Sequence, residues 1–234
     1  MKLALLITLM IIIYLIRKNK TSIARETLKA PSKMYSLNDG NQSNLLISVN
    51  INSEWLKSLK EKYDWNNFDE YDNRMWEYMY KLFDEAMEKS EIRDYNKLWN
   101  NLNRQQKIFW AFLSFNGDTD NGGVYQFVFN KPEFLVAVNE TFKELGLKKL
   151  EVDYYNVIKE LTGKKSKIDE LKSVFNNQST SWNKRWNSFA EGYKELKSAE
   201  VIEKYYYDKE FKKTLYKTVS DYIEQNIDKF AVIA

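Results

Sequence analysis

Residues 120–130 read Asp120-Asn121-Gly122-Gly123-Val124-Tyr125-Gln126-Phe127-Val128-Phe129-Asn130, and this stretch decides how the middle of the chain folds. Two adjacent glycines permit a left-handed turn, after which free backbone N–H groups can open a helix. Gln126 and Asn130 are four residues apart, so their amides share one helix face and can bond to each other or to the turn. The segment predicts a helix whose amides brace a tight loop while its aromatic side chains enter the core.

Six residues of this stretch are the candidate functional motif, and they have two interpretations. They are Asn121, Gly122, Gly123, Gln126, Phe127 and Asn130. Partnered amides in aromatic surroundings usually fix a fold, which favours a structural role. The alternative is that the motif is an interface with another protein.

Helical patterns extend on both sides of the motif. Upstream, apolar residues at helical spacing follow Ser53, Asn67 and about Tyr95. The third pattern is expected to break near Asn103 and to end at Asn116-Gly117-Asp118. Downstream, helices are expected from Pro132 to Gly146 and over 150–162, 166–175, 180–205 and 209–230. The prediction is one all-α, multi-helix domain over residues 53–234.

The composition supports helices and excludes several classes of enzyme. Seven glycines and two prolines are too few for the turns of a many-stranded sandwich or barrel. The chain has no His and no Cys, which removes Ser–His and Cys–His catalysis and His- or Cys-ligated zinc and haem. We therefore predict a protein that is not an enzyme, with no catalytic residue, no metal and no cofactor. A carboxylate-dependent hydrolase is the rival hypothesis from another class.

The N-terminus carries an apolar stretch, residues 3–16, followed by Arg17, Lys18 and Lys20. As a helix it would reach about 21 Å, short of the ~30 Å hydrocarbon core, although flanking lysines and arginines can extend that reach. Positive charge after the stretch predicts a single-pass membrane anchor over residues 1–20 with the body in the cytoplasm. One alternative is a cleaved signal segment and export, and another is a buried helix of a soluble protein. Residues 21–52 are predicted to form a flexible tether, with a short extended piece at Leu45–Ile51.

The central motif also carries a resemblance to a known family. The pattern Asn121-Gly122-Gly123-x-x-Gln126-Phe127-x-x-Asn130, followed by a helix ending Glu144-Leu145-Gly146, resembles the C-terminal domain family named after a bacterial DNA-mimic protein. The likeness covers about residues 101–230, extends more loosely back to Glu54, and includes Tyr206-Tyr207-Asp208, Asp221-Tyr222-Ile223 and Phe230. The resemblance implies an all-helical, non-enzymatic fold. In the member that names the family it implies an acidic surface that occupies the DNA-binding face of a transcription factor.

The charge pattern offers one candidate for such an acidic contact face. Its members are Asp64, Asp69, Glu70, Asp72, Glu77, Asp84, Glu85 and Glu88, with Arg74 and Lys81 among them. A charge run of this kind is usually an ordinary solvated helix face. Basic and acidic side chains nearly balance beyond residue 50, whereas DNA mimicry requires dense negative charge spaced like phosphates. The same near-neutral body argues against direct nucleic-acid binding.

A second helix pattern pairs aromatic with basic residues. Trp182 and Trp186 are four residues apart, with Lys184 and Arg185 between them. Such a group could stack a nucleobase, but two tryptophans on one helix face are more typical of a core. The sequence as a whole predicts a membrane-tethered module that binds an unidentified protein partner. Inhibition of a DNA-binding protein through an acidic surface is the alternative within that class.

Overall fold

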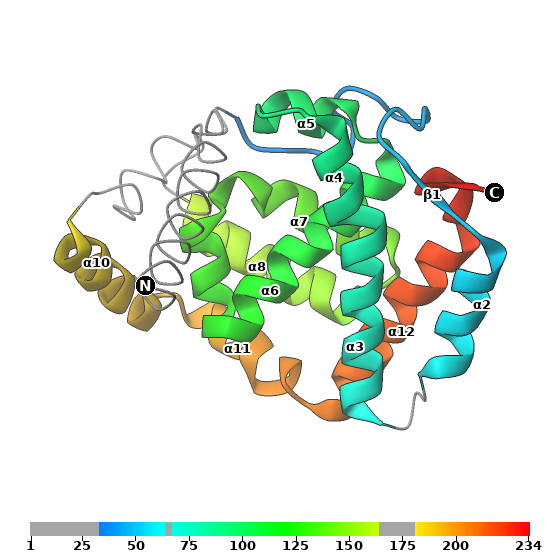
Figure 1. Cartoon of the computed structure of the whole chain (residues 1–234). Helices are drawn as coiled ribbons and strands as arrows, with labels where there is room; N and C mark the ends of the chain where they lie inside the picture. Colours follow the sequence, from blue (N-terminus) through cyan, green and yellow to red (C-terminus); the bar gives the residue numbers. More distant parts are fainter. Residues whose placement is uncertain (1–32, 64–66, 164–180) are drawn as a thin grey trace, which may run out of the picture.

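The computed structural model describes residues 33–63, 67–163 and 181–234 (Figure 1). Helices dominate these ranges, which confirms the all-α prediction. The elements are β1 (Val49–Ile51), α2 (Ser53–Lys62), α3 (Phe68–Tyr78), η1 (Met79–Asp84), α4 (Glu85–Ser90), α5 (Tyr95–Asn101), α6 (Arg104–Asn130), η2 (Pro132–Phe134), α7 (Leu135–Glu144), α8 (Lys148–Thr162), α10 (Trp182–Glu195), α11 (Lys197–Tyr206), α12 (Lys209–Gln225), η3 (Ile227–Lys229) and β2 (Ala231–Ile233).

Several predictions fall outside the described ranges. They are the anchor over residues 1–20, the first part of the tether, and the helix expected over 166–175. Within the described ranges, no helix combines the length and the apolar character that a membrane crossing requires.

The centre of the domain is α6, which packs against α7, α10, α11, α12 and η1. It begins at a capping box, in which the Asn103 side chain accepts the Gln106 N–H and the Gln106 side chain accepts the Asn103 N–H. This confirms the break that the sequence predicts near Asn103. The predicted end at Asn116-Gly117-Asp118 is wrong, because α6 continues as a helix to the glycine pair. Burial of Phe115 and Thr119 on either side of this polar segment keeps it helical against its own propensity.

The helices α3, η1 and α4 form one continuous rod from Phe68 to Ser90 (Figure 1). Its middle part, Met79–Asp84, is a π-helix, and the backbone N–H of Glu85 donates to the carbonyl of Tyr80, five residues earlier. Tyr71, Met75, Tyr78, Leu82 and Ala86 bury one side of the rod against the core. A π-helical segment inside an α-helix widens the helix locally, and such segments are frequent at functional sites. We refer to this element as the rod.

Residues 33–52 correct the predicted tether. Tyr35 and Leu37 are fully buried, and the ring of Tyr35 stacks on that of Trp99 with centroids 4.7 Å apart. Further along, β1 forms inside the predicted extended piece Leu45–Ile51. Tyr35 and Leu37 stand among polar residues without a sustained helical or strand period, so the sequence pattern does not reveal that they enter the core. The domain therefore includes residues from 33 onward and does not begin at residue 53.

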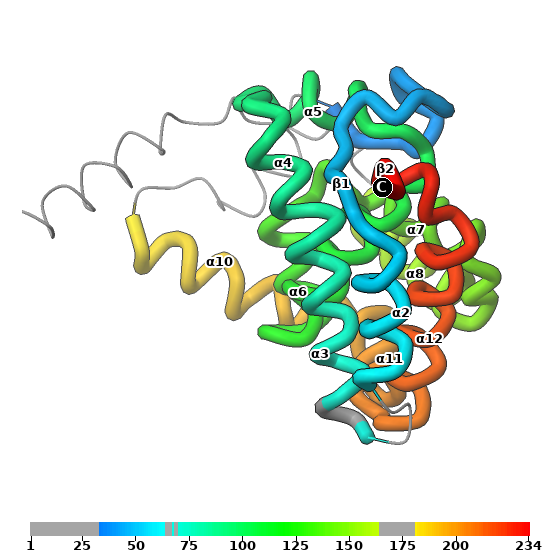
Figure 2. The backbone as a smooth tube through the Cα atoms, turned by 45° about the vertical axis from the view of Figure 1, so that its right-hand side comes forward, coloured from blue at the N-terminus to red at the C-terminus, as the bar shows by residue number. Residues whose placement is uncertain are grey.

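One small sheet joins the two ends of the described domain. β1 pairs in parallel with β2, with Val49 opposite Ala231 and Ile51 opposite Ile233. The pairing brings residues near the start of the domain beside the end of the chain, as the neighbouring positions of β1 and the C-terminus show (Figure 2). The same figure shows α10 extending from the side of the bundle.

Candidate functional site

The glycine pair of the motif places a sharp kink in α6. Gly122 has φ −167° and ψ 29°, and Gly123 has φ +84° and ψ 172°, so both leave the helical conformation. Only Gly123 lies in the left-handed region that strongly favours glycine. A Cβ on Gly123 would also overlap Oε1 of Glu203, which accepts the backbone N–H of Val124 at 2.8 Å. Glycine at this position permits both the turn and the approach of α11.

The motif amides brace this kink through one carboxylate. Asn130 Nδ2 donates to Asp118 Oδ1 at 2.9 Å, and Gln126 Nε2 lies 3.5 Å from the same oxygen. Lys131 Nζ lies 3.2 Å from Asp118 Oδ2. These contacts connect the helical segments before and after the glycine pair. Phe127 is fully buried and packs edge-to-face against Phe115.

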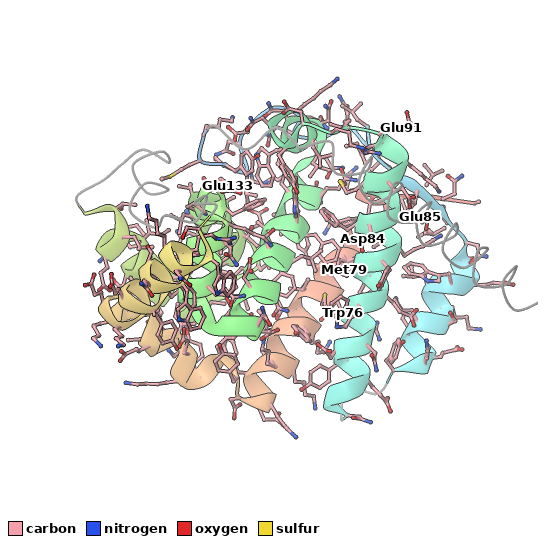
Figure 3. The ribbon with its side chains drawn as sticks, turned by 60° about the vertical axis from the view of Figure 1, so that its left-hand side comes forward. Trp76, Met79, Asp84, Glu85, Glu91 and Glu133 are labelled. Atoms are coloured by element: carbon pink, nitrogen blue, oxygen red, sulfur yellow. The ribbon has the colours of Figure 1, made fainter. Side chains whose placement is uncertain are left out.

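A cleft opens beside the motif, between the rod, α6 and α12. We call it the α3–α6 cleft; its volume is about 450 Å³ and it is lined by Asp72, Met75, Trp76, Met79, Leu113, Asn116, Gly117, Asp120, Asn121 and Tyr216. The cleft brings together the two regions that the sequence singled out separately, since Asp72 belongs to the acidic run and Asn121 to the motif. Trp76 and Met79 form part of its wall on the rod (Figure 3).

A buried polar network adjoins the cleft, with Lys212 at its centre. The Lys212 side chain is 4% exposed, and its ammonium forms an ion pair with Asp120 and donates to Asn116 Oδ1 at 3.0 Å. The ammonium also lies 3.8 Å from the ring centroid of Tyr206. Burial lowers the pKa of Lys212, although the charge of Asp120 opposes that effect. A buried ammonium of this kind is stable only because carboxylate, amide and ring surround it.

The hydroxyl of Tyr216 links this network to the cleft. It donates to Asp120 Oδ2 at 3.3 Å and accepts from Asn116 Nδ2 at 3.1 Å. Burial raises the pKa of Tyr216, and the negative charges of Asp120 and Asp72 raise it further. Tyr216 is therefore a neutral hydrogen-bond donor at the end of the cleft.

The predicted acidic face is divided rather than continuous. Asp64 and the side chain of Asp69 lie outside the described part, and Glu70 accepts a hydrogen bond from Asn67. Burial acts to raise the pKa of Glu77, but hydrogen bonds from Lys62 and Tyr63 outweigh it and lower that pKa. Hydrogen bonds from Lys81 and Lys89 lower the pKa of Glu85. Two members of the face thus carry lysine partners.

Four acidic residues of the rod, Glu77, Asp84, Glu85 and Glu88, line a second depression. We call it the acidic groove; it measures about 460 Å³ and is lined by Trp55, Glu77, Tyr80, Lys81, Asp84, Glu85 and Glu88. Asp84 and Glu88 are exposed, one helical turn apart. Partial burial raises the pKa of Asp84. Figure 3 shows Trp76, Met79, Asp84 and Glu85 in succession along the rod.

The sequence interpretation missed the aromatic residues that accompany these carboxylates. Trp76 is 51% exposed and Tyr80 is 64% exposed, and their ring centroids are 6.5 Å apart. Trp76 lines the cleft and Tyr80 lines the groove. We call this pair the aromatic ridge. Their spacing of four residues on one helix was a signal that could have identified the pair.

The prediction of a core position for Trp182 and Trp186 is wrong. They are 69% and 56% exposed, and their rings stack with centroids 6.3 Å apart. No residue of α10 is buried, and this helix contacts the bundle through Phe189 and Tyr193, whose rings meet Tyr125 of α6. Two aromatic residues at helical spacing therefore do not by themselves indicate a core.

The comparisons with known proteins concern the part of the domain from α5 to α12. A family model described as DMP19-like protein matches residues 100–226, more than half of the chain. The match supports the DNA-mimic family that the sequence resembles. No match was found among curated proteins or among solved structures.

Within the described residues, no group of three or more acidic side chains is arranged to hold a metal ion.

Proposed function

This chain belongs to the DMP19-like protein family, and from that premise we propose that it is a protein-interaction module whose contact surface is the rod. The partner surface that fits is basic. The observation that carries the proposal is the aromatic ridge of Trp76 and Tyr80, which has carboxylates on both sides: Asp72 and Asp120 line the cleft, and Asp84 and Glu88 line the groove.

The ridge has the properties of a binding hot spot. Tryptophan and tyrosine contribute large apolar areas with little rotamer freedom, and they dominate measured interface energies. Carboxylates around them attract a basic partner and exclude an acidic one. An aromatic face also binds lysine and arginine directly. The π-helical segment Met79–Asp84 begins beside Trp76 and includes Tyr80, and such segments are frequent at functional sites.

Inhibition of a DNA-binding protein is the form of this function that the family suggests. Asp84 and Glu88 supply negative charge without a lysine partner among the described residues, whereas Glu77 and Glu85 have such partners. The resulting charge is local and does not form a long row of the phosphate type. We therefore propose that the rod recognises a short basic segment of its partner. Duplex DNA should compete with the rod for the partner only if the partner is a DNA-binding protein.

The hydrolase hypothesis requires two carboxylates in one cleft, and Asp72 and Asp120 do line the same cleft. Asp120 is engaged by the ammonium of Lys212 and by the hydroxyl of Tyr216. A carboxylate held in this way stabilises the cleft wall and is poorly placed to exchange a proton with a substrate. The geometry favours binding over hydrolysis.

A photo-cross-linking residue at position 80 in the host cell would test the proposed function. We expect it to capture a discrete protein, and Trp76→Ala in the same chain should reduce capture by about tenfold or more, as the loss of an aromatic hot spot does. Trp182→Ala is the matched control, since it also removes an exposed tryptophan but from another helix. Equal capture by the Trp76→Ala chain, or loss of capture in the Trp182→Ala chain instead, would place the interface elsewhere.

A further inference from the structure

We infer that the α3–α6 cleft is a socket for one arginine side chain of the partner. The inference rests on the proposed function, because it names the chemical group that the rod recognises. The proposed occupant has an alkyl stem against the apolar wall and a guanidinium group at the carboxylates.

The charge of the cleft provides the first step. Two carboxylates, Asp72 and Asp120, face the same region, and the ammonium of Lys212 interacts with both. Lys212 forms its ion pair with Asp120. One ammonium group, that of Lys212, therefore faces two carboxylates. Among the described lining residues no second positive charge balances the other carboxylate. A singly charged cation restores the balance.

Hydrogen bonding provides the second step. The Tyr216 hydroxyl donates to Asp120 and also interacts with Asp72, but it has only one hydrogen to give. Asn116 does not donate to Asp72: its amide nitrogen donates to Tyr216, and its carbonyl oxygen accepts from Lys212 and Tyr206. Asp72 therefore retains acceptor capacity that the described lining does not fill. A guanidinium group brings several donors in a planar fork that matches a carboxylate.

The shape of the cleft provides the third step. Met75, Met79 and Leu113 form an apolar wall on the way to the carboxylates, and Trp76 stands half exposed at this wall. An alkyl stem packs favourably against methionine and leucine. The indole of Trp76 offers a face on which a guanidinium can stack, and arginine uses such faces more often than lysine.

Gly117 makes the inference testable without damage to the fold. It lines the cleft on the helical part of α6, and a Cβ at this position would meet no atom within 4 Å. Gly117→Ala should leave the cleft open. Gly117→Phe should fill it, because Gly117 lines the cleft and the space beside its Cα is open.

The experiment measures binding of N-acetyl-arginine amide to the full-length chain by NMR titration. The uncharged isostere N-acetyl-citrulline amide is the matched probe. We expect saturable binding of the arginine probe and none of the citrulline probe. Asp72→Asn should weaken binding by about tenfold, the effect of losing one ion pair in a partly buried site, and Gly117→Phe should abolish it. Gly117→Ala, and Asp228→Asn at an exposed carboxylate outside both the cleft and the groove, should bind as the wild type does.

The inference is overturned if the arginine probe fails to bind, or binds Asp72→Asn and Gly117→Phe as well as the wild type. It is also overturned if Asp84→Asn causes the loss, which would assign the cation to the acidic groove. The proposed function is tested separately by cross-linking at position 80. Partner capture without arginine binding would support the proposed function and reject the arginine socket. Arginine binding without partner capture would support the socket and reject the proposed function.

Discussion

Among the described residues two lysines are almost entirely buried, and each stabilises a different part of the fold. Lys212 stabilises the junction of α6 and α12 beside the cleft, as described above. Lys107 on α6 is fully buried, and its ammonium donates to the backbone carbonyls of Asp39 and Asn41. These contacts attach the N-terminal segment to the central helix. A charged residue in the middle of a core helix is a feature that apolar periodicity alone does not predict.

The pH dependence of stability should reveal Lys107. Burial lowers the pKa of Lys107 to about 8, from 10.5 for an ordinary lysine. Between these values the unfolded chain keeps a proton that the folded protein has already released, so the Lys107 contribution to the free energy of unfolding increases as pH rises from about 8 to 10.5. Below about pH 8 both states are protonated and the contribution is constant.

The test compares urea unfolding of the wild type and Lys107→Met at pH 7 and at pH 10. We expect Lys107→Met to be less stable at both values because two carbonyls lose their donor. The deficit should be larger at pH 10. Lys204→Met, an exposed position on α11, is the control and should show the same difference from wild type at both pH values. A deficit that is constant with pH would contradict the lowered pKa.

Gly123 and Gly117 should respond in opposite directions to substitution. Gly123→Val forces a β-branched residue into the left-handed region, beside Glu203, and should cost roughly 2 kcal/mol or more of folding free energy. Gly117→Ala, in a helical position with open space, should stabilise the protein by about 0.5–1 kcal/mol. Thermal unfolding measures both. An unchanged midpoint for Gly123→Val would show that the turn is not constrained.

At the scale of single elements, the kinked helix α6 shows what local sequence can decide. The pair Gly122-Gly123 predicted a left-handed turn, and Gly123 adopts one. Asn116-Gly117-Asp118 looked equally like an end, yet the helix continues because Asn116 bonds to Tyr206 and Tyr216 and the neighbouring Phe115 is buried. Those partners are about 90–100 residues away in sequence, so no local pattern reports them.

The brace across the kink should make a modest contribution to stability. Asn130→Ala removes a 2.9 Å hydrogen bond to Asp118, but Asn130 is exposed and Asp118 keeps Lys131. We expect a loss of about 0.5–1.5 kcal/mol, and a smaller loss for Gln126→Ala, whose contact is 3.5 Å long. Hydrogen exchange at the amides of residues 120–124 should become faster in both variants. Normal exchange together with lost partner capture would instead identify the motif as an interface.

The site was less predictable than the fold for the same reason. The sequence identified the acidic run and the motif as separate candidates, and Asp72 and Asn121 do line one cleft. It could not show that Glu77 has a lysine partner, because Lys62 reaches Glu77 only through the packing of α2 beside the rod. The partners of Glu85, by contrast, lie four residues away on the rod itself and are visible in the sequence. Nor could it place Tyr216 and Lys212, which come from the far end of the chain. Contacts between distant segments decide which carboxylates remain available.

At the scale of the whole molecule, the described domain is closed by its own ends. β1 pairs with β2, and the segment from residue 33 packs against α5 and α6 through Tyr35 and Lys107. Because the domain includes residues from 33 onward, only residues 17–32 separate it from the apolar stretch over residues 3–16. An interval of this length, residues 17–32, can span at most about 55 Å when extended. A membrane attachment there would keep the rod close to the bilayer and limit which partners can reach it.

We therefore propose that the chain is anchored through residues 3–16, with the domain in the cytoplasm. Arg17, Lys18 and Lys20 follow the apolar stretch directly and resist translocation, whereas Lys2 and the α-amino group give a weaker bias in the other direction. We expect the domain to sediment with membranes and to resist protease until cells are opened. Replacement of Arg17, Lys18 and Lys20 by glutamine should weaken that protection.

Protease protection decides between two kinds of partner. A protected, membrane-bound domain gives the rod access to cytoplasmic proteins, including DNA-binding proteins near the membrane. Digestion from outside intact cells, or recovery of a soluble chain that begins after Ala24, would show export. An exported domain could not regulate a cytoplasmic DNA-binding protein, so the DNA-mimic form of the function would be rejected. The aromatic ridge and the arginine socket do not depend on compartment, and in that case they would direct the search to basic proteins of the envelope or the exterior.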